Sequence, residues 1–219
     1  MATIKKQGRP KSEEKYHLIL HAASCLFLKE GFANTSMDTV AKASGVSKQT
    51  VYSHFESKDA LFKAAISSKC HSYQLDTQQL IDASLGSLSL FECLQKVGCQ
   101  FVRLLQDPEA IAIFRVIIAE AVNSPHVATL FYQAGPEASL ATLSTVIEKF
   151  GQGSLSADVA QQLAVDYCAL LKGEYHTMML CGIKSPLTDD EITAHVNSAA
   201  EKILLLFTHY TKQSGKHLK

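Results

Sequence analysis

The chain has 219 residues, of which 47% are hydrophobic and 19% charged, with only 11 glycines and 5 prolines. This composition is typical of a globular protein with a large core, and it excludes a disordered, collagenous or low-complexity chain. No apolar run approaches the ~20 residues that a transmembrane helix needs, and the basic N-terminus leads into no apolar signal-peptide segment. The six cysteines form no C-x-x-C pair, so we expect reduced thiols in a cytoplasmic protein.

The net charge is zero but unevenly distributed along the chain. Residues 1–63 carry ten Lys and Arg against six Asp and Glu, a net charge of +4, and the remainder carries −4. A basic first quarter on an acidic body predicts that the N-terminal segment meets a polyanion.

Apolar residues recur with helical spacing almost throughout, and no run with period two is bounded by turns, so we expect an all-α fold. The first helix should be capped by Ser12 and end before Gly31. The expected helices span residues 12–30, 37–43, 48–54, 58–80, 87–106, 108–122, 136–150, 157–182 and 189–211. Residues 82–88 read as a linker, and residues 1–10 and 212–219 as ragged ends.

Several helix starts are marked by capping residues or by proline at the first helical position. These starts are Ser36, Ser47, Ser57, Asp107-Pro108, Ser124-Pro125, Gly135-Pro136, Ser156 and the capping box Thr188–Glu191.

The stretch 37–56, MDTVAKASGVSKQTVYSHFE, has the spacing of a helix-turn-helix. Ala41 is small where the two helices cross, Gly45 can adopt a positive φ in the tight turn, and Val51 packs the second helix onto the first. The second helix should start at Ser47 and turn polar side chains outward. A bare A-x₃-G-x₅-V match of this kind is common and is not decisive by itself.

The surrounding sequence is more distinctive. Gly31-Phe32, Thr35-Ser36, Val51-Tyr52-x-His54-Phe55 and Lys58-Asp59-x-Leu61 together resemble the DNA-binding domain of TetR-family regulators. The resemblance implies an all-α homodimer that binds an operator in double-stranded DNA. Its domains would be a three-helix DNA-binding domain over residues 12–65 and a larger helical regulatory and dimerisation domain over residues 66–212.

A second resemblance lies further along the chain. Residues 114–122, FRVIIAEAV, followed by Pro125 and then by Gly135-Pro136, are similar to the regulatory domain of AefR-like repressors.

Helix position and the family pattern agree on the DNA contacts. Hydroxyls at a helix N-terminus and a lysine near a helix start suit phosphates, whereas Gln, Lys and Thr suit base edges. The phosphate candidates are Thr35, Ser36, Ser47, Tyr52 and Lys58. The base candidates are Lys48, Gln49, Thr50 and His54. Tyr52 and His54 can instead be packing residues, and Arg9 and Lys11 are either a DNA-binding arm or a solvated tail.

The C-terminal two-thirds should dimerise and hold a small, largely apolar effector. We expect dimerisation through the long segments 157–182 and 189–211, which are rich in Ala, Leu and Met. Segment 157–182 has apolar residues on two faces, one for the core and one for a partner. The candidate ligand-binding residues are Phe101, Phe114, Arg115, Phe131, Tyr132, Tyr167, Glu174, His176 and Met178. Glu174 and Arg115 interrupt apolar stripes, where they either line a pocket or are a structural ion pair or surface groups.

Ligand binding would release a repressor from DNA, with helix 58–80 joining the two domains.

Enzyme motifs are missing from the sequence: there is no G-x-S-x-G, P-loop or H-E-x-x-H, and we predict no catalytic residues and no cofactor. His17 and His21 have i, i+4 spacing but no further ligand nearby, so no metal site is predicted. The remaining alternative is a helical ligand-binding or scaffold protein that does not bind DNA.

Overall fold

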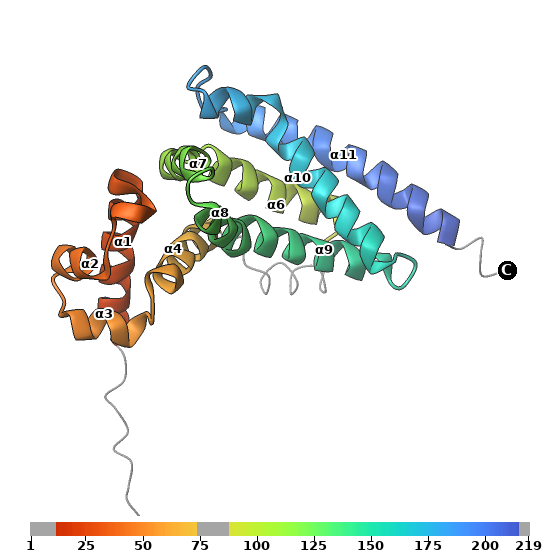
Figure 1. Ribbon diagram of the computed structural model, residues 1–219. Coiled ribbons are helices and arrows are strands. Elements are labelled where there is room, and N and C mark those ends of the chain that lie inside the picture. The colour runs from red at the N-terminus through yellow and green to blue at the C-terminus, as the bar shows by residue number, and fades with distance from the viewer. Residues whose placement is uncertain (1–11, 74–87, 215–219) are drawn as a thin grey trace, which may run out of the picture. The chain divides into compact units, whose positions relative to one another are not determined.

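The computed structural model describes residues 12–73 and 88–214 (Figure 1). Within these ranges all regular secondary structure is helical, so the predicted all-α class is confirmed. The chain divides between Ala65 and Ile66 into two compact units. No helix in the described ranges combines the length and the apolar character needed to cross a bilayer.

The first unit is a small helical domain in which α2 packs against both α1 and α3. Its helices are α1 (Glu13–Asn34), α2 (Met37–Ser44), α3 (Lys48–His54) and the beginning of α4 (Lys58–Ser72). Three phenylalanine rings, Phe27, Phe32 and Phe62, meet with centroids 5.1 to 5.8 Å apart. They form the aromatic part of a core to which each of these elements contributes buried side chains.

Local capping explains where these helices begin and end. Ser36 and Thr39 form a capping box at α2, and the Ser47 hydroxyl accepts from a backbone N–H in the first turn of α3. Ser12 stands at the start of α1, but its side chain makes no capping hydrogen bond, contrary to the prediction. The helical geometry of α1 is interrupted at Gly31, as predicted, although a short helical stretch follows it.

The second unit is a larger helical assembly. Its helices after α4 are α6 (Leu90–Leu105), α7 (Pro108–Glu120), α8 (Pro125–Tyr132), the π-helical segment η1 (Gln133–Glu137), α9 (Ala138–Gly151), α10 (Ala157–Leu180) and α11 (Asp189–Ser214). Helix α9 packs along α10, and α11 packs along both α6 and α10 (Figure 1). The main core of this unit lies between these four long helices.

Two predicted helices differ from the structure. No helix begins at Pro136; instead α8 continues through the π-helical segment into α9, and Pro136 lies inside that segment. Proline cannot donate the next helical hydrogen bond, and the wider π turn accommodates that gap. The predicted helix over residues 157–182 is interrupted at Gly173, whose φ of 51° and ψ of −169° favour glycine.

Some predicted segments fall partly or wholly outside the described residues. Helix α4 is described as far as Ser72, so the predicted continuation over residues 74–80 is not covered, nor is the linker over residues 82–87. Arg9 and Lys11 also lie outside the described ranges. At the other end, residues 212–214 belong to α11 rather than to a ragged terminus.

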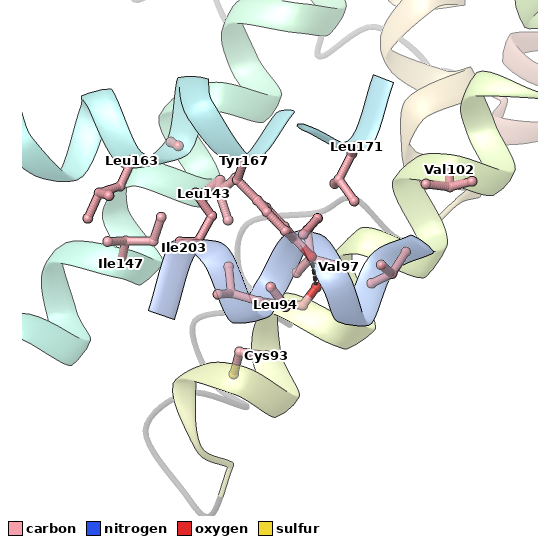
Figure 2. Packing of buried hydrophobic residues seen from close by; sticks show 14 of the residues in the cluster. Cys93, Leu94, Val97, Val102, Leu143, Ile147, Leu163, Tyr167, Leu171 and Ile203 are labelled. Carbon is pink, nitrogen blue, oxygen red and sulfur yellow. Dashed lines mark hydrogen bonds between the residues drawn. The ribbon is translucent and has the colours of Figure 1, made fainter. Parts of the chain in front are cut away.

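Tyr167 is the centre of the second unit's core (Figure 2). Its side chain is fully buried, and its hydroxyl donates to the Leu94 carbonyl at 2.6 Å. Gly98 gives this ring its room: a Cβ there would overlap the Tyr167 hydroxyl oxygen and lie 2.6 Å from Cγ1 of Val196. Helices α6, α10 and α11 therefore meet at one closely packed point.

Candidate nucleic-acid interface and ligand cavity

The helix-turn-helix is built as its sequence predicts. Val40 of α2 and Val51 of α3 are fully buried, and Ala41 is 6% exposed. Gly45 closes α2 with φ 70° and ψ 18°, the left-handed conformation that a residue with a Cβ rarely adopts. These contacts fix the orientation of α3 on α2, so the outer face of α3 is presented by a rigid support.

The outer face of α3 carries polar side chains in the first two turns. Lys48, Gln49 and Tyr52 are exposed, with Tyr52 46% accessible. The Ser47 hydroxyl lies 2.8 Å from the Thr50 hydroxyl and also accepts from the Thr50 backbone N–H at 3.1 Å. Because the Thr50 hydroxyl is engaged in this pair, the methyl group is the part of that side chain left for an apolar contact.

An ion pair joins the two helices of the motif. The Lys48 ammonium lies 2.8 Å from the Asp38 carboxylate, and more than half of each side chain is exposed. The hydrogen bond to Asp38 and its negative charge raise the pKa of Lys48. The Lys48 ammonium also lies 6.0 Å from the centre of the Tyr52 ring. Asp38 was not among the predicted site residues, although the sequence places it in the first turn of α2.

Two of the predicted phosphate-binding side chains serve the protein's own backbone. Thr35 is only 1% exposed, and its hydroxyl donates to the Gly31 carbonyl at 2.8 Å, so the expectation of a phosphate contact through this hydroxyl needs correction. The physical reason is that the broken end of α1 leaves a carbonyl to satisfy. The Lys58 ammonium donates to the Phe32 carbonyl at 2.7 Å and lies 4.2 Å from the Phe32 ring centre. Ser36, by contrast, is exposed.

His54 lies at the end of α3 among aromatic rings. It is half-buried, with its ring centroid 6.1 Å from Tyr16 and 6.3 Å from Phe55. Tyr16 in turn stacks on Phe55 at 5.1 Å. This environment favours the packing alternative for His54, because the ring contributes to the contact between α1 and α3.

The second unit contains a cavity of about 90 Å³. Its walls come from the C-terminal part of α4 and from α6 to α10, and they are mostly apolar. Phe101, Phe114 and Phe131, all predicted ligand-binding residues, line it, and the last two rings meet edge to face at 5.0 Å. A smaller cavity of about 20 Å³ adjoins it, sharing Phe101 and including the predicted residue Tyr167 in its wall.

The other five predicted ligand-binding residues do not line either cavity. Tyr132 is 49% exposed, and Glu174 is exposed as well. The Arg115 guanidinium donates to the carbonyls of Met179 and Leu180 at 2.9 and 2.8 Å, so it caps the C-terminal end of α10. Glu174 and Arg115 are therefore surface and capping groups rather than groups of a pocket.

The interruption at Gly173 explains the error on α10. An unbroken helix carries the stripe of Tyr167 and Leu171 on to Glu174 and Met178, whereas the structure buries Tyr175, His176 and Met179 instead. His176 packs edge to face against Phe114 at 5.4 Å, behind the cavity wall, and its Nδ1 has no hydrogen-bond partner. Met178 is half-buried away from both cavities.

Two lysines that sequence analysis did not select line the larger cavity, Lys69 of α4 and Lys172 of α10. Lys69 is paired with Asp107 and Glu109 at 2.9 and 2.8 Å. None of the salt bridges in the described residues involves Lys172, which is an exposed residue. The sequence could have indicated Lys172 as a lining residue, because it follows Cys168 by four positions and therefore lies on the same helix face.

Asp107 ties α4 to the N-terminus of α7. Its carboxylate accepts from Tyr73 at 2.6 Å and from Lys69, and one oxygen caps α7. Burial raises the pKa of Asp107, but the hydrogen bonds from Tyr73 and Lys69 outweigh it, and the net shift is downward. Burial and the bond to this carboxylate raise the pKa of Tyr73 to about 12.

The predicted dimerisation helices expose apolar side chains. Val165 of α10 is 40% exposed, and Leu205 and Leu206 of α11 are 73% and 39% exposed. These are the side chains available for a partner on the two helices that the sequence assigned to dimerisation.

Comparisons with known proteins place both parts of the chain. The model of the bacterial regulatory proteins of the TetR family matches residues 19–65, and the model of the AefR-like transcriptional repressor C-terminal domain matches residues 92–209. Both matches confirm the resemblances found in the sequence.

Individual relatives agree. The flavonoid-responsive regulator FrrA is 32% identical, with a TM-score of 0.68 over 89% of this chain and 97% of FrrA. A Mesorhizobium loti protein assigned to the TetR family shares the fold, with 23% identity and a TM-score of 0.71 over 91% of this chain and 98% of that one. The Bacillus subtilis HTH-type transcriptional regulator YerO is 26% identical over 172 residues, 76% of this chain, and the match spans about half of YerO, 55% of its length. The chain thus belongs to the TetR family of DNA-binding transcriptional regulators, with an AefR-like C-terminal domain.

Proposed function

We propose that this regulator is a cytoplasmic repressor that binds a near-palindromic operator as a homodimer and is released by a small hydrophobic effector. The observation that carries the DNA-binding part is the polar outer face of α3, held in place by the buried Val51 and the Gly45 turn. A single short reading helix makes too few contacts for tight binding, so two copies of it are needed, one per half-site.

In the operator complex α3 enters the major groove. Gln49 contacts an adenine edge, and the Thr50 methyl group contacts a thymine methyl, since the Thr50 hydroxyl is paired with Ser47. Lys48 exchanges Asp38 for a guanine or a phosphate oxygen. Tyr52, Ser47 and the helix start at Ser36 hold phosphates. Lys58 exchanges the Phe32 carbonyl for a further phosphate, and Arg9 and Lys11 add cationic contacts.

Dimerisation uses the exposed apolar side chains of α10 and α11, chiefly Leu205. Pairing through these helices sets the separation of two reading heads, which must match one helical turn of DNA, about 34 Å. An effector that changes this separation therefore weakens operator binding without touching the DNA.

The effector binds in the phenylalanine-lined cavity. FrrA is by name responsive to flavonoids, which supports a hydrophobic effector here. The cavity is about 90 Å³, below the ~300–1,000 Å³ of ordinary ligand pockets, so an effector binds best to a state in which the cavity is enlarged. A ligand changes an equilibrium only through such unequal affinity for two states. Ile66 and Lys69 of α4 line the cavity, so α4 is the element that enlargement displaces.

The test is footprinting and gel-shift titration on the DNA next to the gene for this protein. Gln49→Ala and Thr50→Ala should each relax the preference at one position per half-site, at ~1–3 kcal/mol for a good contact. Lys58→Ala should weaken binding to all sequences and reduce the salt slope by about one. The matched control is Gln161→Ala, at an exposed glutamine on α10. It should leave the base preference and the salt dependence of binding unchanged. Unaltered base preference in both α3 variants would reject this assignment.

A further inference from the structure

We propose that the larger cavity of the second unit binds a hydrophobic organic acid whose anionic group pairs with Lys172. The inference rests on the proposed function, because it assigns the chemical class of the effector. Lys172 is exposed and yet lines the cavity, so it marks the side on which the cavity reaches solvent. Phe101, Phe114 and Phe131 line the apolar interior.

The two lysines at the cavity differ in their charge balance. The ammonium of Lys69 is shared between two carboxylates, Asp107 and Glu109, and is therefore compensated within the protein. Among residues 12–73 and 88–214, the recorded salt bridges include none for Lys172. Asp107 and Glu109 are not among the lining residues, so the charged side chains of the cavity wall are the two lysines, and Lys172 is the one that no carboxylate pairs in the described residues.

Neighbouring groups are affected by the positive charge of Lys172. Burial raises the pKa of the Cys168 thiol to about 11, and the charge of Lys172 opposes that shift. Burial lowers the pKa of His176, and the same lysine lowers it further. Cys168 lines the cavity and His176 packs against Phe114 of its wall, so the charge of Lys172 acts at the edge of the cavity that α10 forms.

This arrangement discriminates by ligand charge. A buried anion is costly unless it is paired and hydrogen-bonded, and Lys172 supplies both a counter-charge and three donors. An ammonium ligand meets repulsion from Lys172, and the two carboxylates that pair with Lys69, Asp107 and Glu109, do not line the cavity. Glu174 is exposed and outside the lining, so it does not reverse this balance.

The shape of the site favours an elongated apolar body. The larger and smaller cavities share Phe101, Ser139 and Cys168 in their walls, so the two spaces adjoin at these side chains. In the proposed complex the Phe101 ring moves aside, and the site then extends into the smaller cavity, whose wall includes Tyr167. A ligand with its acid at Lys172 then reaches the second cavity with its far end.

The experiment uses matched probes of one shape and three charges: phenylalkanoic acids, the corresponding phenylalkanols and the phenylalkylamines, titrated calorimetrically into the full-length protein. The wild type should bind each acid at least about tenfold more tightly than the alcohol of equal length, as expected for a charge-assisted hydrogen bond. Lys172→Met should abolish that preference, and Lys172→Arg should keep most of it. Lys149→Met, at an exposed lysine on α9, is the matched control and should change nothing.

Ser139→Leu tests the shape, because a larger side chain between the cavities should weaken binding of long acids more than short ones. Four outcomes would each overturn the inference. The wild type could bind acid and alcohol equally, or the acid preference could survive in Lys172→Met. The amines could bind most tightly, or no probe could bind at all. Operator binding is measured separately on the same preparations without probe. If the wild type does not bind the operator, the proposed function is contradicted. If it binds the operator but shows no preference for the acids, only the proposed ligand class is contradicted.

Discussion

The contact between Gly98 and Tyr167 makes a quantitative prediction about the core that supports the cavity and the dimerisation helices. Gly98→Ala places a methyl group against the Tyr167 hydroxyl and 2.6 Å from Cγ1 of Val196. Overpacking of this kind costs ~1–3 kcal/mol, and the better helix propensity of alanine returns up to ~1 kcal/mol. With the full ~1 kcal/mol returned, the net loss in the free energy of unfolding is about 0–2 kcal/mol, and the two close contacts place Gly98→Ala toward the upper end.

Tyr167→Phe should cost about 1 kcal/mol, because it removes a buried hydroxyl that donates to Leu94. The same change removes one of the two obstacles to alanine at Gly98. The double variant should therefore lose about 1 kcal/mol less than the sum of the single losses, as contacting residues commonly do. The second obstacle, Val196, keeps the rescue incomplete.

Urea unfolding followed by circular dichroism measures this cycle, with every variant at one protein concentration because the proposed dimerisation makes stability depend on concentration. Gly98→Ala combined with Tyr132→Phe, a half-exposed tyrosine in the same unit, is the control and should be additive. Strict additivity of the Gly98 and Tyr167 variants, or a stabilising Gly98→Ala, would refute the steric reasoning.

Three further predictions concern the dimer and the titratable groups. Leu205→Glu should convert the proposed dimer to a monomer in sedimentation, since this side chain is 73% exposed on α11; a dimer that persists in the variant rejects the assigned face. As the pH falls below about 6.5 the wild type should lose stability, because burial depresses the pKa of His176 in the folded state and protons then favour the unfolded chain. His176→Phe should reduce this dependence of stability on pH, and an unchanged dependence would show that His176 is not its cause. Asp107→Asn should lower the free energy of unfolding by about 1–2 kcal/mol. It should also lower the pKa of Tyr73 from its value of about 12, as measured by absorbance in an alkaline titration; if both quantities are unchanged, the coupling between Asp107 and Tyr73 is rejected.

The helix-turn-helix was predictable because its determinants are local. Gly45 closes α2, Ser36 and Ser47 cap the two helices, and Val51 lies at the position that packs them together. Each of these roles depends on neighbours within a few residues, so spacing alone indicates it. The phenylalanines of the cavity were predictable for a similar reason, since helical periodicity places Phe101, Phe114 and Phe131 on inward faces.

The charges around the cavity were not predictable in the same way. The break at Gly173 changes which side chains of α10 face inward, and periodicity assumes an unbroken helix. Arg115 finds its partners at Met179 and Leu180, more than sixty residues away, so its capping role depends on tertiary structure. Lys172 remained unnoticed because a lysine on a long helix is ordinarily a solvated surface group.

The ion pair between Lys48 and Asp38 has a consequence for how the protein searches a genome. A lysine that must leave a carboxylate before it contacts DNA adds little to the attraction that all duplex sequences share. It adds its full share only where a base or a well-placed phosphate is the better partner. In the proposed operator complex the pair thus lowers absolute affinity but widens the gap between the operator and its competitors. Because a genome offers some 10⁶–10⁹ non-specific sites, that ratio decides what fraction of the protein occupies its operator.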